Sequence, residues 1–431
     1  MTKTNYKVEI TAGFTTFFTA MYIIIVNPAI LSPAGFDYNA TLTATVLVSA
    51  LSSIGMGLYA KNPILVAPGM GLNAFIALTL INNQSISPEI ALGAIFISGI
   101  VFLVLSVFNI RSYIVQAIPL NIRHAIAIGI GLFISLIGFI NAGFIIKGQP
   151  LSAVQFDNPI VITFLVTLLV AIILVLKKVK AAFIITIVIG TIIAWPIGRW
   201  YGDASSINFG NTELVYWKGF IAAPDFSLFF SMDIIGALKW SIFPLTFGIL
   251  FADMFDSIGT FVGVAEACNL KDDNGLPRNM KKSLIVDSLA TTFAGLFGTS
   301  PGTAYIESAA GIQEGGKTGL TAIVAGLLFL PFMFFSPLLS IVPAIATAPV
   351  LVLVGVYMLK PISIIDWSDF KSALPAFITL FIIPFTYSIT QGIIWGLLSY
   401  TLIQIIQGKA KDIPFALWII DIFILLHLFI N

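Results

Sequence analysis

Three carboxylic acids stand out because they lie within otherwise apolar sequence. Asp253 and Asp256 occur in FADMFDSIGTF, and Glu307 occurs in GTSPGTAYIESAAG. Spaced three apart, the two aspartates share one helix face. An ionised side chain at the centre of a membrane helix costs about 2.5 to 3.5 kcal/mol, so such an acid is retained where it has a partner or a task. Two carboxyls this close in an apolar surround are not expected to ionise together. This predicts proton coupling by Glu307, Asp256 and Asp253.

Each of these acids also has a structural interpretation, as do their neighbours. A buried aspartate can cap a helix or accept a hydrogen bond from a nearby hydroxyl group. Asn73, in APGMGLNAF, can donate and accept, which suits an amide-like ligand edge, although an interhelical hydrogen bond is an equal alternative. Gly71 lies in the same stretch as a further candidate contact. Phe75 and Tyr305 could stack on a planar ring, but with 37 Phe in the chain packing is the simpler role.

Two Pro-Gly pairs interrupt the apolar runs, Pro68-Gly69 and Pro301-Gly302. Proline lacks the backbone N–H, and glycine weakens helical conformation, so each pair breaks the helical hydrogen-bond ladder. Within a membrane, such breaks are tolerated where the freed groups are buried in protein or face a polar cavity. We expect two half-helix N-termini to converge near the midplane and hold a polar solute. The alternative is that both pairs only kink tightly packed helices.

The composition defines the setting of these residues. The 431 residues are 58% hydrophobic and 10% charged, with a mean hydropathy of +1.03, whereas soluble chains carry about 25% charged residues. The apolar runs are continuous, which predicts an all-α polytopic membrane protein and excludes a barrel. The N-terminus shows no cleavage site, so the first span is expected to remain. The single cysteine, Cys268, excludes an intramolecular disulfide and offers no metal cluster, and no basic run indicates nucleic acid.

About fourteen transmembrane helices are predicted. They lie near residues 10–32, 40–60, 64–82, 88–109, 122–145, 157–177, 181–199, 240–264, 281–297, 300–315, 318–338, 342–360, 370–388 and 390–407. With a cytoplasmic N-terminus, every even connection carries Lys or Arg, as cytoplasmic loops do. Most odd connections carry neither, and the exceptions there are Lys147, Arg199 and Lys218. We expect a multi-pass protein of the plasma membrane. The apolar segment 414–430 is either a fifteenth span or an interfacial helix.

The two halves of the chain show a weak internal repeat. Residues 67–75 align with 300–308, and residues 118–138 resemble 342–360. Seven spans per copy is an odd number, so the second copy is inserted upside down relative to the first. Inverted repeats with Pro/Gly-interrupted segments at matching positions indicate the central site of a secondary transporter.

The acids also limit the solute. Glu307 and Asp256 disfavour an anion such as sulfate or bicarbonate, and the chain lacks the oxygen-rich or soft ligand set that a metal carrier requires. A neutral planar heterocycle fits better. Its ring N–H groups can donate to the carboxylates, and Asn73 and backbone groups can satisfy its carbonyl and ring nitrogens.

The motifs FADMFDSIGT, GTSPGTAYIESAAG and APGMGLNAF resemble those of the nucleobase cation symporter 2 (nucleobase-ascorbate transporter) superfamily, in its AzgA-like purine permease branch. The resemblance implies a 7+7 inverted repeat of the UraA/UapA-like fold, with broken segments in spans 3 and 10. It implies a core domain (9–109 and 233–338), a gate domain (110–199 and 339–407), an extracellular loop (200–232) and a C-terminal apolar segment (408–431). In this family pattern, Asp256, Glu307 and Asn73 match the acid of span 8, the glutamate of span 10 and the asparagine of span 3. The sequence SPGTAY departs from the usual Thr/Ser-rich approach to that glutamate.

The function expected from this resemblance is import of purine nucleobases, guanine or hypoxanthine and also adenine, by proton symport with an elevator motion. The protein is expected to be no enzyme and to use no cofactor, since it lacks a nucleotide-binding GxxxxGK[ST] sequence and depends on a gradient. Its partners would be the purine, protons, the lipid bilayer and, through the gate, a second copy. Alternatives are a uracil or xanthine carrier of the same fold, or an ion carrier or channel. The preferred purine, and proton versus sodium coupling, stay open.

Overall fold

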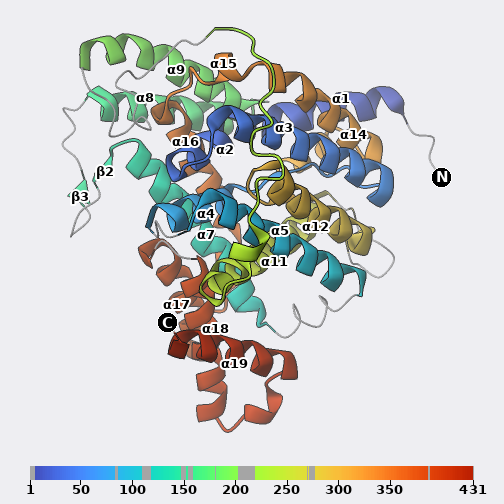
Figure 1. The fold of residues 1–431 in the computed structure, drawn as a ribbon, viewed down its shortest axis with the longest axis vertical. Coiled ribbons are helices and arrows are strands. Elements are labelled where there is room, and N and C mark those ends of the chain that lie inside the picture. Colours follow the sequence, from blue (N-terminus) through green and yellow to red (C-terminus); the bar gives the residue numbers. More distant parts are fainter. Residues whose placement is uncertain are drawn as a thin grey trace.

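The computed structural model describes residues 5–82, 86–108, 118–146, 152–153, 159–179, 181–201, 219–268, 270, 277–386 and 389–430. The described chain is helical apart from two short strand pairs (Figure 1). Apolar side chains fill the interior, and exposed large apolar side chains cover much of the outer surface, as expected when lipid replaces water as the solvent. The predicted all-α membrane architecture is therefore confirmed.

The first half of the chain contains eight of the labelled helices and three strands. These are α1 (Tyr6–Ala20), α2 (Ile23–Leu31), α3 (Tyr38–Gly55), β1 (Val66–Pro68), α4 (Met70–Asn82), α5 (Pro88–Val107), α7 (Leu120–Asn141), β2 (Ile145–Ile146), β3 (Ser152–Ala153), α8 (Pro159–Leu176) and α9 (Ala182–Tyr201). Side-chain caps start three of them: Asn5 accepts from the N–H of Val8, Asp37 from that of Ala40, and Ser87 from that of Ile90.

The described part of the second half contains ten labelled helices and one strand. Its elements are α10 (Ile234–Ala237), α11 (Phe243–Cys268), α12 (Met280–Phe297), β4 (Gly302–Ala304), α13 (Ser308–Gln313), α14 (Gly319–Phe329), α15 (Ser336–Leu339), α16 (Ala344–Met358), α17 (Phe370–Thr386), α18 (Ile389–Ile406) and α19 (Phe415–Ile430). Within the described residues, six helical stretches are long and apolar enough to cross a membrane, and five further apolar helices are shorter. The number fourteen stays a prediction.

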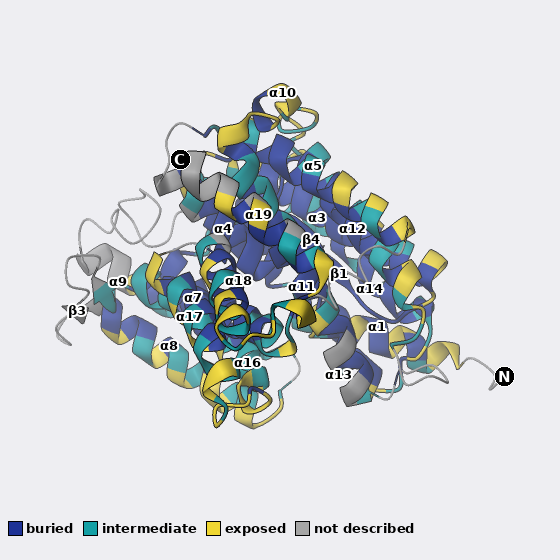
Figure 2. Ribbon diagram, turned by 90° about the horizontal axis from the view of Figure 1, so that it is seen from below, coloured by how far each residue is buried: buried dark blue, intermediate teal, exposed yellow. Residues whose placement is uncertain are grey.

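The helices form two groups that draw on both halves of the chain (Figure 2). In one group, α1, α3 and α5 pack against α12 and α14. In the other, α7, α8 and α9 pack against α16, and α17 contacts both α7 and α18. The helices α7 and α16, which cover most of the repeated stretches 118–138 and 342–360, pack directly against each other. A Cβ atom on Gly131 of α7 would lie only 2.6 Å from the Cβ atom of Met358, so this contact requires glycine.

The assignment of these groups to a core and a gate domain is not tested by the packing and stays a prediction, as do the exact bounds of those domains. The predicted extracellular loop, 200–232, lies mostly outside the described residues, as do Lys147 and Lys218. The C-terminal segment forms α19, which packs on α18, where the hydroxyl of Thr401 donates to Asp421 at 2.6 Å.

The predicted breaks in spans 3 and 10 take the form of strands rather than bent helices. Residues 61–69 are not helical, and neither are residues 299–305. Strand β1 pairs antiparallel with β4, with Val66 opposite Ala304 and Pro68 opposite Gly302. A membrane interior offers no water, so backbone groups that proline frees from a helix must find hydrogen-bond partners within the protein. Here each of the two segments provides the backbone hydrogen-bond partners of the other.

Candidate functional site

The strand pair is closed by further backbone and side-chain hydrogen bonds. The N–H of Gly69 donates to the carbonyl of Pro301 at 2.8 Å, and the N–H of Tyr305 donates to that of Leu65 at 2.9 Å. The phenol of Tyr305 donates to the carbonyl of Pro68. The N–H of Leu65 donates to the hydroxyl of Ser308 at 2.9 Å. The two interrupted segments therefore converge, as the sequence predicted.

Glu307 lies just before α13 and is half-buried. Its Oε1 accepts a hydrogen bond from the phenol of Tyr22 at 2.7 Å, and its backbone carbonyl accepts one from the hydroxyl of Thr19 at 3.4 Å. A hydrogen bond to a charged acceptor is worth about 1.5 to 3 kcal/mol, so Tyr22 holds this carboxylate in one position.

Tyr22 also connects this carboxylate to the second helix group. The Tyr22 ring meets the Phe183 ring of α9 edge-on, with 5.3 Å between centroids. The Phe183 ring in turn lies 6.1 Å from that of Tyr357 on α16. The chain of contacts from Glu307 through Tyr22 to Phe183 therefore crosses from one group of helices to the other.

The two aspartates of α11 have different surroundings. Asp256 is half-buried, and it lies close to the side chain of Thr303 on β4 and within electrostatic range of Glu307. Asp253 is only 1% exposed, and its Oδ2 accepts from the hydroxyl of Thr291 on α12. The structure therefore brings Glu307 and Asp256 together beside the strand pair, and it packs Asp253 against α12.

Asn73 takes part in a buried polar network behind the strand pair. Its amide nitrogen donates to the Oδ1 of Asn27 at 3.0 Å. The amide nitrogen of Asn27 donates to the hydroxyls of Thr45 and Thr299, both at 2.7 Å, and its Oδ1 also accepts from Ser300 at 2.8 Å. All five side chains are fully buried, with exposures of 0%. The interhelical alternative for Asn73 is therefore present, and its Oδ1 has no hydrogen-bond partner among the described residues.

The other predicted contact residues are also buried. Phe75 is 2% exposed and Tyr305 is 4% exposed. A Cβ atom on Gly71 would overlap the Cγ2 atom of Ile130 and lie 3.8 Å from its Cβ atom. Glycine at this position lets α4 of the first helix group touch α7 of the second.

Sequence reasoning missed Tyr22, Thr303 and the central role of Asn27. Tyr22 is a single hydroxyl in the run MYIIIVNP, 285 positions from its partner Glu307, so no local spacing connects them. Asn27 did offer a signal, because an amide inside an apolar run needs partners. Within the described residues, no group of three or more His, Cys, Asp or Glu side chains could hold a metal ion.

Comparison with solved structures gives the fold. The transmembrane domain of the cyanobacterial bicarbonate transporter BicA superposes with a TM-score of 0.65 at 15% sequence identity, covering 91% of this chain and 98% of that one. SLC26A9 also gives a TM-score of 0.65, at 11% identity, covering 93% of this chain and 65% of that one. This similarity establishes the 7+7 inverted-repeat fold and nothing about the solute.

Comparison of sequences gives the family. The sequence model described as "Permease family" matches residues 7–394. The chain is 37% identical over 434 residues to the adenine permease AdeP of Escherichia coli K12, covering 99% of this chain and 94% of that protein. It is 38% identical over 435 residues to the guanine/hypoxanthine permease PbuO of Bacillus subtilis 168, covering 99% and 98%. The chain therefore belongs to this permease family, the nucleobase cation symporter 2 family, in its purine permease branch, and it is a membrane transporter and not an enzyme.

Proposed function

We propose that the protein imports purine nucleobases across the plasma membrane, with its N-terminus in the cytoplasm. The observation that carries this proposal is the pair of half-buried carboxyls beside the paired strands: Glu307, which accepts a hydrogen bond from Tyr22, and Asp256, which lies close to Thr303. An ionised carboxylate is a hydrogen-bond acceptor, so the two acids suit the ring N–H edge of a neutral base. The names of the relatives AdeP and PbuO support adenine, guanine and hypoxanthine as substrates.

The same two acids repel an anion unless both carry protons. The fold is shared with a bicarbonate transporter, but the carboxyls argue against bicarbonate as the solute of this chain. The remaining predicted contacts, Asn73, Gly71, Tyr305 and Phe75, are buried in this structure. In the proposal they shape the wall of the site from behind the strand pair.

Proton symport is the second part of the proposal. One carboxyl of the Glu307 and Asp256 pair takes up a proton when it faces outside and releases it inside, so that the inward proton gradient drives accumulation. Asp253 supports this pair indirectly. Its bond to Thr291, whose hydroxyl also lies 3.2 Å from the carbonyl of Gly302, holds α11, α12 and β4 together.

An elevator motion is the third part. It is supported by the division into two helix groups and by the close approach of α4 to α7 at Gly71 and Ile130. In this motion the group that carries β1, β4 and α11 slides against the group that contains α7 and α16. A homodimer through the second group would keep that group fixed in the bilayer.

Uptake in proteoliposomes tests the proposal. Full-length protein is reconstituted, and radiolabelled hypoxanthine is supplied outside under an inward proton gradient, an inward sodium gradient, or neither. We expect accumulation with the proton gradient alone, loss of accumulation with an uncoupler, and competition by unlabelled guanine or adenine but not by uracil. Accumulation driven only by sodium would reject proton symport, and competition by uracil but not by purines would reject the purine assignment.

A further inference from the structure

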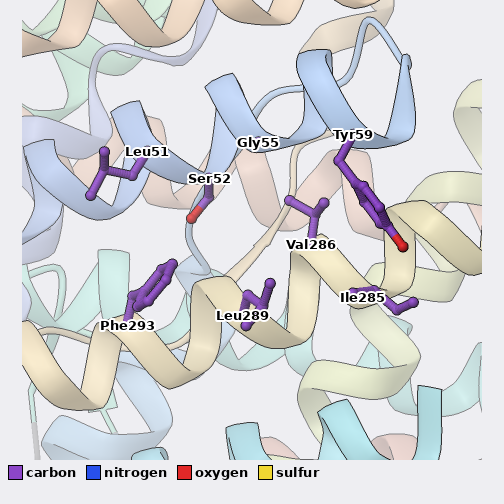
Figure 3. A pocket seen from close by; sticks show the side chains of 8 residues that line it. All are labelled: Leu51, Ser52, Gly55, Tyr59, Ile285, Val286, Leu289 and Phe293. Carbon is purple, nitrogen blue, oxygen red and sulfur yellow. The ribbon is translucent and has the colours of Figure 1, made fainter. Parts of the chain in front are cut away.

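A groove lies on the outer face of the first helix group, between α3 and α12. It has a volume of about 200 Å³ and is lined by Leu51, Ser52, Gly55, Tyr59, Ile285, Val286, Leu289 and Phe293. Figure 3 shows these side chains reaching from both helices into the shared space, with the Tyr59 ring at one end and Phe293 at the other. The lining is apolar apart from two hydroxyl groups.

This groove is separate from the candidate site and open to the surroundings. Leu51 is 44% exposed and Tyr59 is 50% exposed, so the groove lies on a surface that lipid covers in a membrane. Gly55 forms part of its floor, and a Cβ atom there would meet only Val286, at 3.6 Å. The absence of a side chain at Gly55 therefore leaves space that no neighbouring protein atom fills.

Positive charge is concentrated at the Tyr59 end of the groove. The ammonium group of Lys282 lies 5.7 Å from the centroid of the Tyr59 ring. Lys281 and Lys61 are exposed close by in sequence, each within two positions of one of these two residues. The distribution of Lys and Arg places this end at the cytoplasmic surface, where anionic lipid headgroups attract basic residues.

We propose that the groove binds an anionic phospholipid of the cytoplasmic leaflet. One acyl chain fills the groove from Tyr59 to Phe293, and the headgroup phosphate pairs with Lys281 and Lys282. The groove is complementary to both parts of such a lipid: its apolar lining suits the hydrocarbon chain, and the lysines at one end suit the negatively charged headgroup. A zwitterionic phospholipid offers the same chains but a headgroup without net charge.

Native mass spectrometry of the full-length protein tests this site. Detergent-purified protein is titrated with dioleoyl phosphatidylglycerol or dioleoyl phosphatidylcholine, and the affinity of the first lipid bound is measured. Each lysine near an anionic surface contributes about 1 kcal/mol, so we expect the double variant Lys281→Gln/Lys282→Gln to bind phosphatidylglycerol about 25-fold more weakly, with phosphatidylcholine binding unchanged. Lys177→Gln, at an exposed lysine of the second helix group, is the matched control and should change neither lipid.

A second variant tests the chain-binding part. Gly55→Leu fills the groove and should weaken both lipids, whereas Leu58→Phe, which adds volume at a side chain that is 65% exposed and outside the groove, should weaken neither. Equal affinity of the wild-type protein for the two lipids would overturn the proposal. So would equal losses in the Lys281/Lys282 and Lys177 variants, since both outcomes indicate only non-selective lipid around the protein. The lysine variants keep the test valid if Gly55→Leu does not fold.

Discussion

The two interrupted segments share one backbone device but differ in their side chains. In the first, only Gly69 separates β1 from α4, which begins at Met70, and the polar residue Asn73 donates to Asn27 in a buried network. In the second, three residues separate β4 from the short helix α13, and one of them is the half-buried acid Glu307. The repeat therefore supplies a symmetric scaffold, and of the two interrupted segments only the second carries a carboxylic acid. We infer that the first segment contributes the sliding contact between the two helix groups, and that the second contributes the acid that binds substrate and proton.

The largest expected effect concerns the contact of the first segment with the second helix group. Cysteines at Gly71 and Ile130, in a Cys268→Ala background, would place their Cβ atoms about 3.8 Å apart, the usual value for a disulfide. If the two groups must slide past each other, oxidation should stop hypoxanthine uptake and a reductant should restore it. The single-cysteine variants under the same oxidant are the controls. Full uptake by the cross-linked protein would exclude relative motion at this contact.

Glu307→Gln should abolish accumulation of hypoxanthine and reduce its binding about 10- to 100-fold, because the amide cannot carry the proton and forms weaker hydrogen bonds. Asn73→Ala is the comparison in the first segment. It should lower the free energy of unfolding by about 1 kcal/mol, through the lost bond to Asn27, with a smaller effect on uptake. Uptake assays and thermal unfolding in detergent measure both quantities. The comparison fails if Asn73→Ala abolishes accumulation while Glu307→Gln retains it.

The two aspartates of α11 give a matched pair on one helix. Asp256→Asn should reduce accumulation about tenfold or more, since Asp256 lies beside Glu307 and β4. Asp253→Asn should retain most of it, because an amide oxygen can still accept the hydrogen bond from Thr291. Initial rates and final accumulation ratios under a proton gradient distinguish the variants. Equal loss in both would give Asp253 a direct share in proton coupling.

The smallest effect is expected for Tyr22→Phe, which removes a hydroxyl but keeps the ring contact with Phe183. Loss of one hydrogen bond to a carboxylate should reduce the uptake rate about five- to tenfold. Phe183→Leu, which leaves the hydroxyl in place, separates the role of the hydroxyl from that of the ring. An unchanged rate in Tyr22→Phe would show that Glu307 does not depend on this donor.

The sequence predicted the fold well because its signals are local. Long apolar runs predict membrane helices, and Pro68-Gly69 and Pro301-Gly302 predict breaks, since each effect depends on neighbouring residues only. The strand pairing was not predictable in this way, because VAP and GTA are too short to show an alternating pattern. The sequence identified the acids, because carboxyl groups are rare in apolar runs. It could not predict which side chains surround each acid. Only the fold shows that Asp256 faces Thr303 while Asp253 packs against Thr291.

The central claim is that the paired strands hold a purine between the acids of α11 and the second segment. An experimental structure of the full-length protein with bound hypoxanthine tests it most directly. The account predicts the base next to β4, with its ring N–H groups within about 3 Å of the Glu307 and Asp256 carboxyl oxygens. A base bound elsewhere in the molecule, with both acids still bonded only to protein groups, would contradict it.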